Sequence, residues 1–413
     1  MKNYLRRLLL TFLFLSVPVF SFADFSSRTN STAPIEFLKQ LVSVSSGSGN
    51  TKGVSKVQKI AAAELVKIGF TIEEFPSTNT SVIAKQIVAT RLSTQPATAQ
   101  KFITFVAHAD TVFEQLNPFE ITADGKYLRG SGVGDDKGGL VVGLRALENY
   151  LSQNKAVKYS LRFVISPTEE VGSMGFREKL AAFAKDSVLI LGLEPGRADG
   201  SIVQGRKGVR WYHIKVQGLE AHAGVSPETG INACSQLAIF IQKLTQMNDF
   251  KSGNTLSVGH IEGGKDKFNI VCGAAEAKVD VRFINEASGI KIHNQILMLL
   301  KSINIKSEKT KVKATTTYEL VTQVPSFPAL QTSQKALEQY KKLIFQVEGR
   351  KVTSFLSGGA ADLNYMSDTS AVMLDGIGPF GDGYHTADEA IDLSSVASRT
   401  EVLVRFLNSF QAE

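Results

Sequence analysis

The chain has 413 residues, a formal net charge of +7 and a pI near 9.1, with 43% hydrophobic and 21% charged residues. This length exceeds what one hydrophobic core usually supports, so two domains are expected. The composition is that of an ordinary globular protein. The positive charge favours anionic partners, but it is spread along the chain and forms no basic stripe with interleaved aromatic residues, which argues against nucleic-acid binding.

The N-terminus has the pattern of a secretory signal peptide. Basic residues precede the apolar run 8–22, which ends in the small-x-small sequence Ser21-Phe22-Ala23. The run is interrupted by Pro18 and is shorter than the roughly 20 residues that a bilayer-spanning helix needs, which argues against a membrane anchor. We therefore expect residues 1–23 to be cleaved, the mature chain to start near Asp24 without a membrane attachment, and the protein to be periplasmic or secreted.

Periodicities along the first half of the chain predict alternating helices and buried strands. Two helices and then a strand are expected between Thr32 and Phe75. Further along, strands are predicted at 101–107, 159–166 and 187–193, and helices are predicted between them at 138–150 and 175–184. Short runs rich in Phe, Ile and Val fit strands that are buried on both faces. This alternation predicts an α/β fold with a central mixed sheet flanked by helices.

The pattern changes near Gly208. The following residues predict a strand at 209–216, a helix at 232–246, two strands at 254–262 and 269–283, and a second helix at 288–301. Such a block is typical of a small α+β (ferredoxin-like) unit inserted into a larger domain. The polar stretch 307–317 would return the chain to the first domain, which two further predicted helices complete, at 333–345 and 394–410. We therefore expect a large domain formed by residues 24–207 and 318–413 and an inserted domain at 208–317.

Two cysteines are present, Cys234 and Cys272. An oxidising compartment would permit a disulfide between them. Cys234 falls on the apolar stripe of the predicted helix 232–246 and Cys272 falls in the predicted strand 269–283, so two separately buried thiols are the alternative. The sequence leaves both states open.

Acidic and imidazole side chains gather at the ends of the predicted strands and in glycine-rich loops. They are His108, Asp110, Asp135, Asp136, Glu169, Glu170, Glu194 and His385. Because α/β sheets place ligand sites beyond the carboxyl ends of their strands, we expect these side chains to converge.

Each of these residues has an alternative role when it is considered alone. Asp135 or Asp136 is suited to cap the helix that follows. The adjacent Glu169 and Glu170 would fit a solvated surface, and His385 would fit an incidental position in a loop. Several such groups beside glycines that allow close backbone approach nevertheless indicate a functional site.

The concentration of carboxylates predicts a metal centre. Like charges at one edge of a sheet repel each other, so a divalent cation is expected to hold them together. Histidine and carboxylate ligands without thiolates suit Zn²⁺, with Co²⁺ or Mn²⁺ as alternatives. About five ligands exceed what one catalytic zinc uses, which indicates two ions about 3.5–4 Å apart that share a carboxylate.

Five short stretches resemble the signature of the zinc peptidase family of aminoacylases and glutamate carboxypeptidases. They are His-Ala-Asp-Thr-Val (108–112), Gly-Asp-Asp-Lys-Gly-Gly (134–139), Thr-Glu-Glu-Val-Gly-Ser (168–173), Leu-Glu-Pro (193–195) and Tyr-His-Thr-Ala-Asp-Glu (384–389). Their order and spacing hold across nearly all of the chain after the signal peptide. Within the family, Glu-Pro-Gly-Arg followed by Gly-Arg-Lys-Gly is most similar to the bacterial carboxypeptidase G type.

The resemblance implies a division of the metal ligands between two zinc ions per subunit. Asp135 would bridge the ions. His108 and Glu194 would complete one site, and Glu170 and His385 would complete the other.

The same resemblance implies roles for three further residues. Glu169 would be the general base that takes a proton from the attacking water. Asp110 would orient His108 through its other ring nitrogen. A cis peptide bond would join Asp135 to Asp136.

The inserted domain corresponds to the dimerisation or lid domain of this family. His222 matches a histidine that reaches the partner subunit's site and stabilises the oxyanion. Asn269 and Arg282 match residues that hold the C-terminal carboxylate of the substrate, Arg282 through a charge-assisted pair; a surface ion pair is its alternative role.

A glycine pair completes the implied substrate site. Gly358 and Gly359 match a loop whose backbone contacts the substrate. The sequence departs from the family next to this pair, because Ala361 stands where a serine is common. A hydroxyl contact with the substrate is therefore not expected here.

The sequence thus predicts a homodimeric di-zinc hydrolase that releases a C-terminal amino acid from a short peptide or an N-acyl amino acid. The carboxypeptidase G resemblance favours glutamate, with Arg206 and Lys207 as partners for its side chain. Alternatives are an aminoacylase or dipeptidase with another preference and an aminopeptidase, which Arg282 opposes. A further alternative is an inactive relative that only binds its ligand. The complete set of predicted metal ligands, together with Glu169, argues against it.

Overall fold

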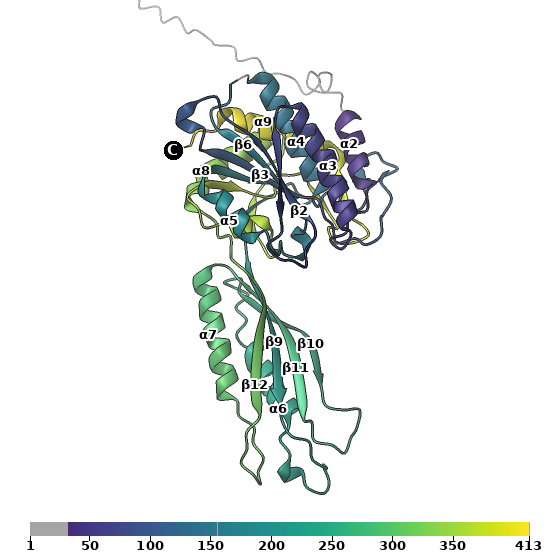
Figure 1. Ribbon diagram of the computed structural model, residues 1–413, viewed down its shortest axis with the longest axis vertical. Helices are drawn as coiled ribbons and strands as arrows, with labels where there is room; N and C mark the ends of the chain where they lie inside the picture. Colours follow the sequence, from purple (N-terminus) through teal and green to yellow (C-terminus); the bar gives the residue numbers. More distant parts are fainter. Residues whose placement is uncertain (1–31, 155, 413) are drawn as a thin grey trace, which may run out of the picture.

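The computed structural model describes residues 32–154 and 156–412, which form two bodies joined end to end (Figure 1). The predicted signal peptide at 1–23 lies outside this range. Within the described ranges, no helix has the length and apolar character of a membrane span. The larger body, here called the large domain, comprises the described residues before 208 and after 324. The smaller body, the small domain, comprises residues 208–324.

A six-stranded mixed sheet forms the centre of the large domain, as predicted. Its strands lie in the order β1 (Thr71–Pro76), β2 (Lys85–Arg91), β6 (Ser160–Ser166), β3 (Phe102–His108), β7 (Ser187–Gly192) and β14 (Val372–Leu374). The last four are parallel to one another, and β1 and β2 are antiparallel to their neighbours. The carboxyl ends of the four parallel strands therefore lie along one edge of the sheet.

Helices cover both faces of this sheet. One face packs against α2 (Thr32–Val42), α3 (Thr51–Lys67), α4 (Lys137–Gln153), α8 (Gln334–Glu348) and α9 (Leu393–Ser409), and the other packs against α5 (Arg177–Lys185). On β3, Phe105 belongs to the first core, where its ring stacks on Phe163 with 5.8 Å between centroids. The next residue, Val106, belongs to the second core together with Leu180 of α5. Burial on both faces explains why these strands read as continuous apolar runs.

Two smaller sheets, which the sequence pattern did not reveal, shape the loops around the candidate site. One pairs β8 (Ile202–Arg206) with β13 (Ser354–Ser357), and the other contains β4 (Glu120–Ile121), β5 (Tyr127–Arg129), β16 (Ala390–Asp392) and β15 (Gly381–Asp382). These strands have only two to five residues each, too few to show a period. Because β5 pairs with β16, the glycine-rich loop 130–139 lies next to the loop that contains His385.

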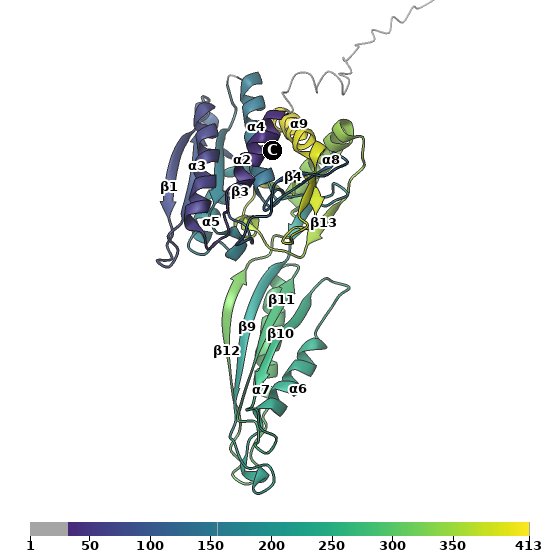
Figure 2. The same ribbon diagram turned by 90° about the vertical axis from the view of Figure 1, so that its right-hand side faces the viewer.

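The small domain has the predicted ferredoxin-like arrangement. In chain order it consists of β9 (Gly208–Gln217), α6 (Ala233–Thr245), β10 (Thr255–Gly263), β11 (Ala274–Phe283), α7 (Glu286–Ser302) and β12 (Thr315–Val324). The strands are antiparallel, in the order β10-β11-β9-β12. Both helices pack on one face of the sheet and leave the other face uncovered (Figure 2).

Two features of the small domain go beyond the sequence pattern. The domain extends past the expected boundary at 317, because β12 continues to Val324. Most side chains of this edge strand are exposed, so its sequence lacks the apolar face that marks a strand. The structure also decides the state of the cysteines: Cys234 and Cys272 form a disulfide, with 5.7 Å between their Cα atoms.

Candidate active site

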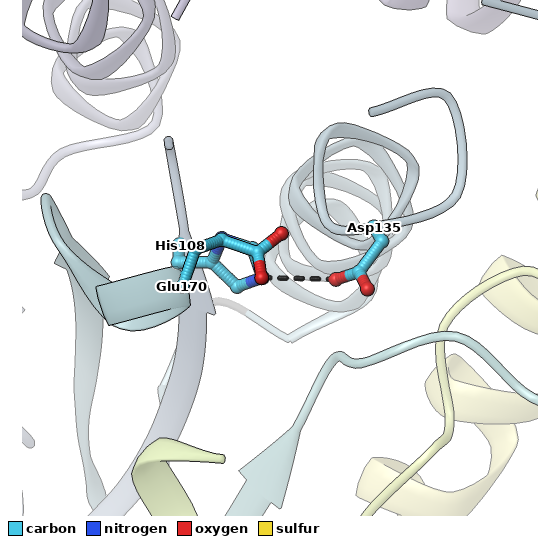
Figure 3. A group of neighbouring side chains, drawn as sticks. All are labelled: His108, Asp135 and Glu170. Carbon is cyan, nitrogen blue, oxygen red and sulfur yellow. Dashed lines mark hydrogen bonds and ion pairs between the residues drawn. The ribbon is translucent and has the colours of Figure 1, made fainter. Parts of the chain in front are cut away.

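The predicted metal ligands converge at the carboxyl edge of the large sheet. His108 is the last residue of β3, Glu169 and Glu170 form a short helical turn after β6, and Glu194 follows β7. Asp135 precedes α4. Figure 3 shows His108, Asp135 and Glu170 approaching one another from three different elements. The potential ligand atoms of these three residues all lie within 4.8 Å of one another.

Asp135 lies between the two histidines. Its Oδ1 is 3.0 Å from His108 Nε2, and its Oδ2 is 3.1 Å from His385 Nε2. His385 Nε2 is also 3.2 Å from Glu170 Oε2, and His108 Nε2 is 3.7 Å from Glu194 Oε1. The carboxylate thus presents one oxygen to each of two His–Glu pairs. This donor set fits a pair of divalent cations that share Asp135.

The acidic residues at the site do not have the alternative roles that each allows alone. The side chains of Glu169 and Glu170 are only 12% and 5% exposed, so they are not a solvated surface pair. Asp136 is at the N-cap position of α4 but makes no side-chain cap bond there. Its Oδ2 accepts a hydrogen bond from the His108 N–H at 3.3 Å, and its buried Oδ1 has no hydrogen-bond partner among the described residues. The Asp135–Asp136 peptide bond is cis.

Burial and crowding shift the acid–base properties of the cluster. Burial raises the pKa of Glu169 well above its usual value and raises the pKa of Glu194 to about 8. Burial also acts to raise the pKa of Asp135, but hydrogen bonds from His108 and His385 outweigh it and lower that pKa. The same contacts with Asp135 and Glu170 raise the pKa of His385 to about 10. The cluster therefore retains protons that a bound cation would replace.

Asp110 organises both the histidine and the glutamate turn. The His108 Nδ1 is 3.0 Å from the main-chain oxygen of Asp110 and 3.4 Å from its Oδ1. The carboxylate also accepts hydrogen bonds from the N–H of Glu169 at 3.0 Å and of Glu170 at 3.1 Å, and from the Ser48 hydroxyl at 2.7 Å. Asp110 therefore fixes the backbone of the residues that carry the predicted base and a predicted ligand.

Three buried carboxylates around the site were not assigned a role from the sequence. Glu389 accepts backbone hydrogen bonds from the loop that contains Asp135. Asp375 pairs with Arg206, its Oδ2 lying 2.6 Å from Arg206 Nε. Asp362 contacts the Ser173 hydroxyl. Asp375 directly follows β14, and this position at a strand end is the signal that marks it. The signal is hidden in the sequence because β14 has only three residues.

The cluster opens into a cleft of about 600 Å³ between the two domains. The large domain lines it with Asp135, Glu169, Glu170, Glu194, Arg177, Arg206, Gly359, Ala361, Tyr365 and His385, and the small domain lines it with Val209, Trp211, Arg282, Thr322 and Val324. The metal ligands and Arg282 thus share one cleft.

Arg282 is held from both sides. Asp280 accepts hydrogen bonds from its Nε at 2.8 Å and its Nη2 at 2.9 Å, and Gly358 accepts one from its Nη1 at 3.2 Å. The last contact joins the small domain to the large domain. Arg282 therefore lines the cleft beside the glycine pair and at the same time keeps an ion pair with Asp280.

Two other residues that were predicted to meet a substrate side chain are not placed to do so in this structure. The Lys207 ammonium lies beside Gly253 of the small domain and does not line the cleft. Arg206 lines the cleft but is buried, with Asp375 and Glu194 as ionic partners, so it is not free for a substrate side chain.

His222 and Asn269 lie at the far end of the small domain. Strand β9 begins next to the cleft and ends at Gln217, roughly 30 Å further along an extended strand. His222 follows that end. The Ala223 N–H donates to the main-chain oxygen of Asn269 at 2.9 Å. His222 and Asn269 are therefore neighbours of each other and not of the metal ligands in the same chain.

Comparisons with known proteins agree with this geometry. Residues 104–409 match peptidase family M20/M25/M40. The chain is 25% identical to carboxypeptidase G2 of Pseudomonas sp. (strain RS-16), covering 91% of this chain and 88% of that protein. It is 24% identical to succinyl-diaminopimelate desuccinylase of Shewanella pealeana, in an alignment that covers 91% of this chain and 97% of that protein. The fold is similar to that of the aminopeptidase PepT of Bacillus cereus, with a TM-score of 0.74 and 23% identity. The match covers 92% of this chain and 98% of that chain.

The family match covers most of the chain and includes each of the clustered His, Asp and Glu residues. Members of this family are metal-dependent hydrolases, and the cluster supplies the ligands that such an enzyme requires. The protein is therefore a hydrolytic metalloenzyme of peptidase family M20/M25/M40.

Proposed function

We propose that this enzyme uses two zinc ions to release a C-terminal amino acid, glutamate in the first instance, from a short peptide or an N-acyl amino acid. The observation that carries the proposal is the position of Arg282 in the same cleft as the metal ligands and Glu169. A guanidinium group there suits a free carboxylate on the leaving amino acid, because such a pair is charge-assisted. The two curated relatives, a carboxypeptidase and a desuccinylase, support a substrate of this class.

The donor arrangement supports the assignment of two ions. In the proposal, Asp135 would be shared by both ions, His108 and Glu194 would hold one, and Glu170 and His385 would hold the other. Bound zinc would polarise the scissile carbonyl and lower the pKa of water.

Glu169 is the base in this proposal. It is buried beside the cluster, with its Oε2 4.0 Å from His108 Nε2, and its raised pKa suits a group that accepts a proton and then donates it. Glu169 would take the proton of the attacking water and pass it to the leaving amine. Asp110 would keep the base in place through the Glu169 backbone.

The preference for glutamate has support from a cation that the sequence pattern did not single out. Arg177 lines the cleft, and its Nε donates to the Gly172 oxygen at 2.8 Å. Its guanidinium lies 5.1 Å from the centre of the Tyr365 ring. Since Lys207 points away from the cleft, Arg177 replaces it in the proposal as the partner of an acidic side chain.

A second copy of the chain completes the site in this proposal. His222 is too far from its own cleft to stabilise an oxyanion there, so it would act on a partner subunit, together with Asn269. The apolar side chains beside these residues support burial against another molecule: Phe268 is 107% exposed and Val225 is 77% exposed.

The proposed location is periplasmic or secreted. The basic and apolar pattern of the first 23 residues supports it, and so does the Cys234–Cys272 disulfide, since such bonds persist in oxidising compartments. Cell fractionation and N-terminal sequencing of the mature chain test this; a cytoplasmic protein that retains residues 1–23 would contradict it.

The test of the activity is amino-acid release by the zinc-loaded mature protein from matched N-aroyl amino acids. Glutamate release at least ten times faster than alanine release would support the full proposal. Faster release of another amino acid would retain the hydrolase and refute the glutamate preference. No release from any substrate, with two zinc ions bound per chain, would refute the reaction class.

A further inference from the structure

Three loops lie at the end of the small domain that is most distant from the cleft, and two of them carry predicted site residues. The third, residues 303–314, supports the first of these two loops, since the Lys309 N–H donates to Glu228 O at 3.0 Å. At the near end of the sheet, Val209 pairs with Arg282, whereas at the far end Gln217 pairs with Ala274. The two loops, residues 218–232 and 264–273, continue from that far end and are called the tip here (Figure 1). They contain His222 and Asn269.

The loops of the tip are aligned by backbone hydrogen bonds. Gly218 N–H donates to Gly273 O at 2.8 Å, Val271 N–H to Ala221 O at 2.9 Å, and Ala223 N–H to Asn269 O at 2.9 Å. These bonds set His222 opposite Ile270 in an isolated bridge. The relative position of His222 and Asn269 therefore depends on the register between the two loops.

Apolar packing contributes little to this register, and the ion pair between Lys265 and Glu220 that joins the two loops at 2.7 Å is exposed and therefore weak. Ile231 is the one buried apolar side chain in residues 218–232 and 264–273, all of which the structure describes. Two larger apolar side chains of the tip, those of Phe268 and Val225, are exposed. Hydrogen bonds between exposed backbone segments are weak restraints by themselves.

The disulfide lies at the base of the tip. Cys272 lies in the second loop between Val271 and Gly273, whose backbones both pair with the first loop, and Cys234 lies in the first turn of α6, which follows the first loop. The Ala233 N–H also donates to Cys272 O at 2.8 Å. A Cβ at Gly263 would lie 2.9 Å from the Cys234 sulfur, so this glycine provides the space that the bridge occupies. The disulfide thus connects both loops to the first turn of one helix.

We infer that the Cys234–Cys272 disulfide is a positioning device that holds His222 and Asn269 in register for delivery to the active site of a second copy of the chain. The inference rests on the proposed function, in which the tip acts on a partner subunit. The disulfide lies at the end of the small domain opposite the cleft of its own chain, so the inference predicts an effect on the site of the partner subunit. Breaking it should lower turnover at the partner's site and leave metal binding unchanged.

Heterodimers separate the effect in trans from an effect in cis. In the first, a chain with E169A, C234S and C272S is combined with a wild-type chain, so that the one competent site receives a tip without the disulfide. In the second, an E169A chain is combined with a C234S/C272S chain, so that the competent site receives an intact tip. The reference is the E169A/wild-type heterodimer.

We expect kcat of the first heterodimer to fall about ten-fold or more relative to the reference, and kcat of the second to stay within about two-fold. Equal losses in both, or no loss in either, would overturn the inference. An L256A variant, which weakens the small-domain core near the cleft end of the sheet, controls for general destabilisation. If the cysteine-free chain does not fold, the E169A/wild-type heterodimer is compared before and after phosphine reduction. A fall in kcat of about ten-fold with unchanged metal content would support the inference, and an unchanged kcat would overturn it.

A measurement that does not depend on activity distinguishes this inference from the proposed function. Loss of the disulfide should accelerate hydrogen exchange of the Ala223 and Val271 amides at least about ten-fold, with little change at Ile214 in the centre of β9. Unchanged exchange in the tip would overturn the inference even in an active enzyme. Faster exchange in a protein that hydrolyses none of the substrates would refute only the proposed reaction.

Discussion

The backbone N–H of Asp135 donates a hydrogen bond to Glu389 Oε1 at 3.0 Å, across a sequence separation of 254 residues. The same carboxylate accepts hydrogen bonds from the N–H of Gly132 at 2.9 Å and of Gly134 at 2.8 Å. Glu389 is 1% exposed. It thus holds the loop that presents the shared carboxylate between His108 and His385.

We predict that Glu389→Gln weakens metal binding about 10- to 100-fold. The amide has one acceptor oxygen for three N–H donors, and its NH₂ group would face a donor, so the loop around Asp135 would lose its fixed position. Competition with a chelator measures the affinity. The exposed neighbour provides a control, because Asp388→Asn should bind metal as the wild type does. Wild-type affinity in the Glu389 variant would contradict this role.

The two adjacent glutamates should separate into base and ligand. We predict that Glu169→Gln lowers kcat about 10²- to 10⁴-fold while two metal ions stay bound. Glu170→Gln should instead release one ion, because its Oε2 lies 3.2 Å from His385 Nε2 at the proposed second metal position. Metal analysis together with steady-state kinetics distinguishes the two variants. Loss of metal from the Glu169 variant would show that this residue is a ligand.

Metal binding should release protons. Contacts with Asp135 and Glu170 raise the pKa of His385 to about 10, so in the metal-free protein the ring is protonated at pH 8. A metal ligand must be neutral, so its proton leaves on binding and metal affinity rises as pH increases towards 10. Titration calorimetry in buffers of different ionisation enthalpy counts the protons. His385→Asn should release about one proton fewer than the wild type, and an equal count would contradict the assignment.

Arg177 should determine the preference for an acidic leaving group. We predict that Arg177→Gln lowers kcat/KM for an N-acylglutamate about ten-fold more than for the corresponding N-acylalanine, because one charge-assisted contact is lost. Lys207→Gln is the matched control, and it should leave the ratio unchanged because Lys207 does not line the cleft. A change of the ratio in the Lys207 variant alone would support the earlier expectation from the sequence.

The disulfide should stabilise the small domain. It closes a loop with a sequence separation of 38, which corresponds to roughly 2–4 kcal/mol of unfolding free energy. Phosphine reduction should therefore lower the unfolding temperature of the wild type but not that of the C234S/C272S variant. Calorimetry measures both, and an equal response of the two proteins would show that the effect of the reductant is unrelated to the bridge.

Much of the site was predictable because its signals are local. His108 ends one strand of the central sheet, Glu194 lies two residues after another, and Glu169 and Glu170 follow a third after a short connection. The chain order itself therefore directs them to the same edge. The buried strands were recognisable because both of their faces are apolar. Strands such as β12 and β14 were not, since one is largely exposed and the other has three residues.

The sequence by itself determined the fold class, the family resemblance and the set of groups able to bind metal, since these are encoded in short motifs and their order. Only the tertiary structure decided which of the remaining charges serve the site. It paired Arg206 with Asp375 across 169 residues, turned Lys207 away from the cleft, and joined Cys234 to Cys272. It also placed His222 far from its own metal ligands. Such facts depend on contacts between distant segments, and these are set by the packing of the whole chain, which no local pattern records.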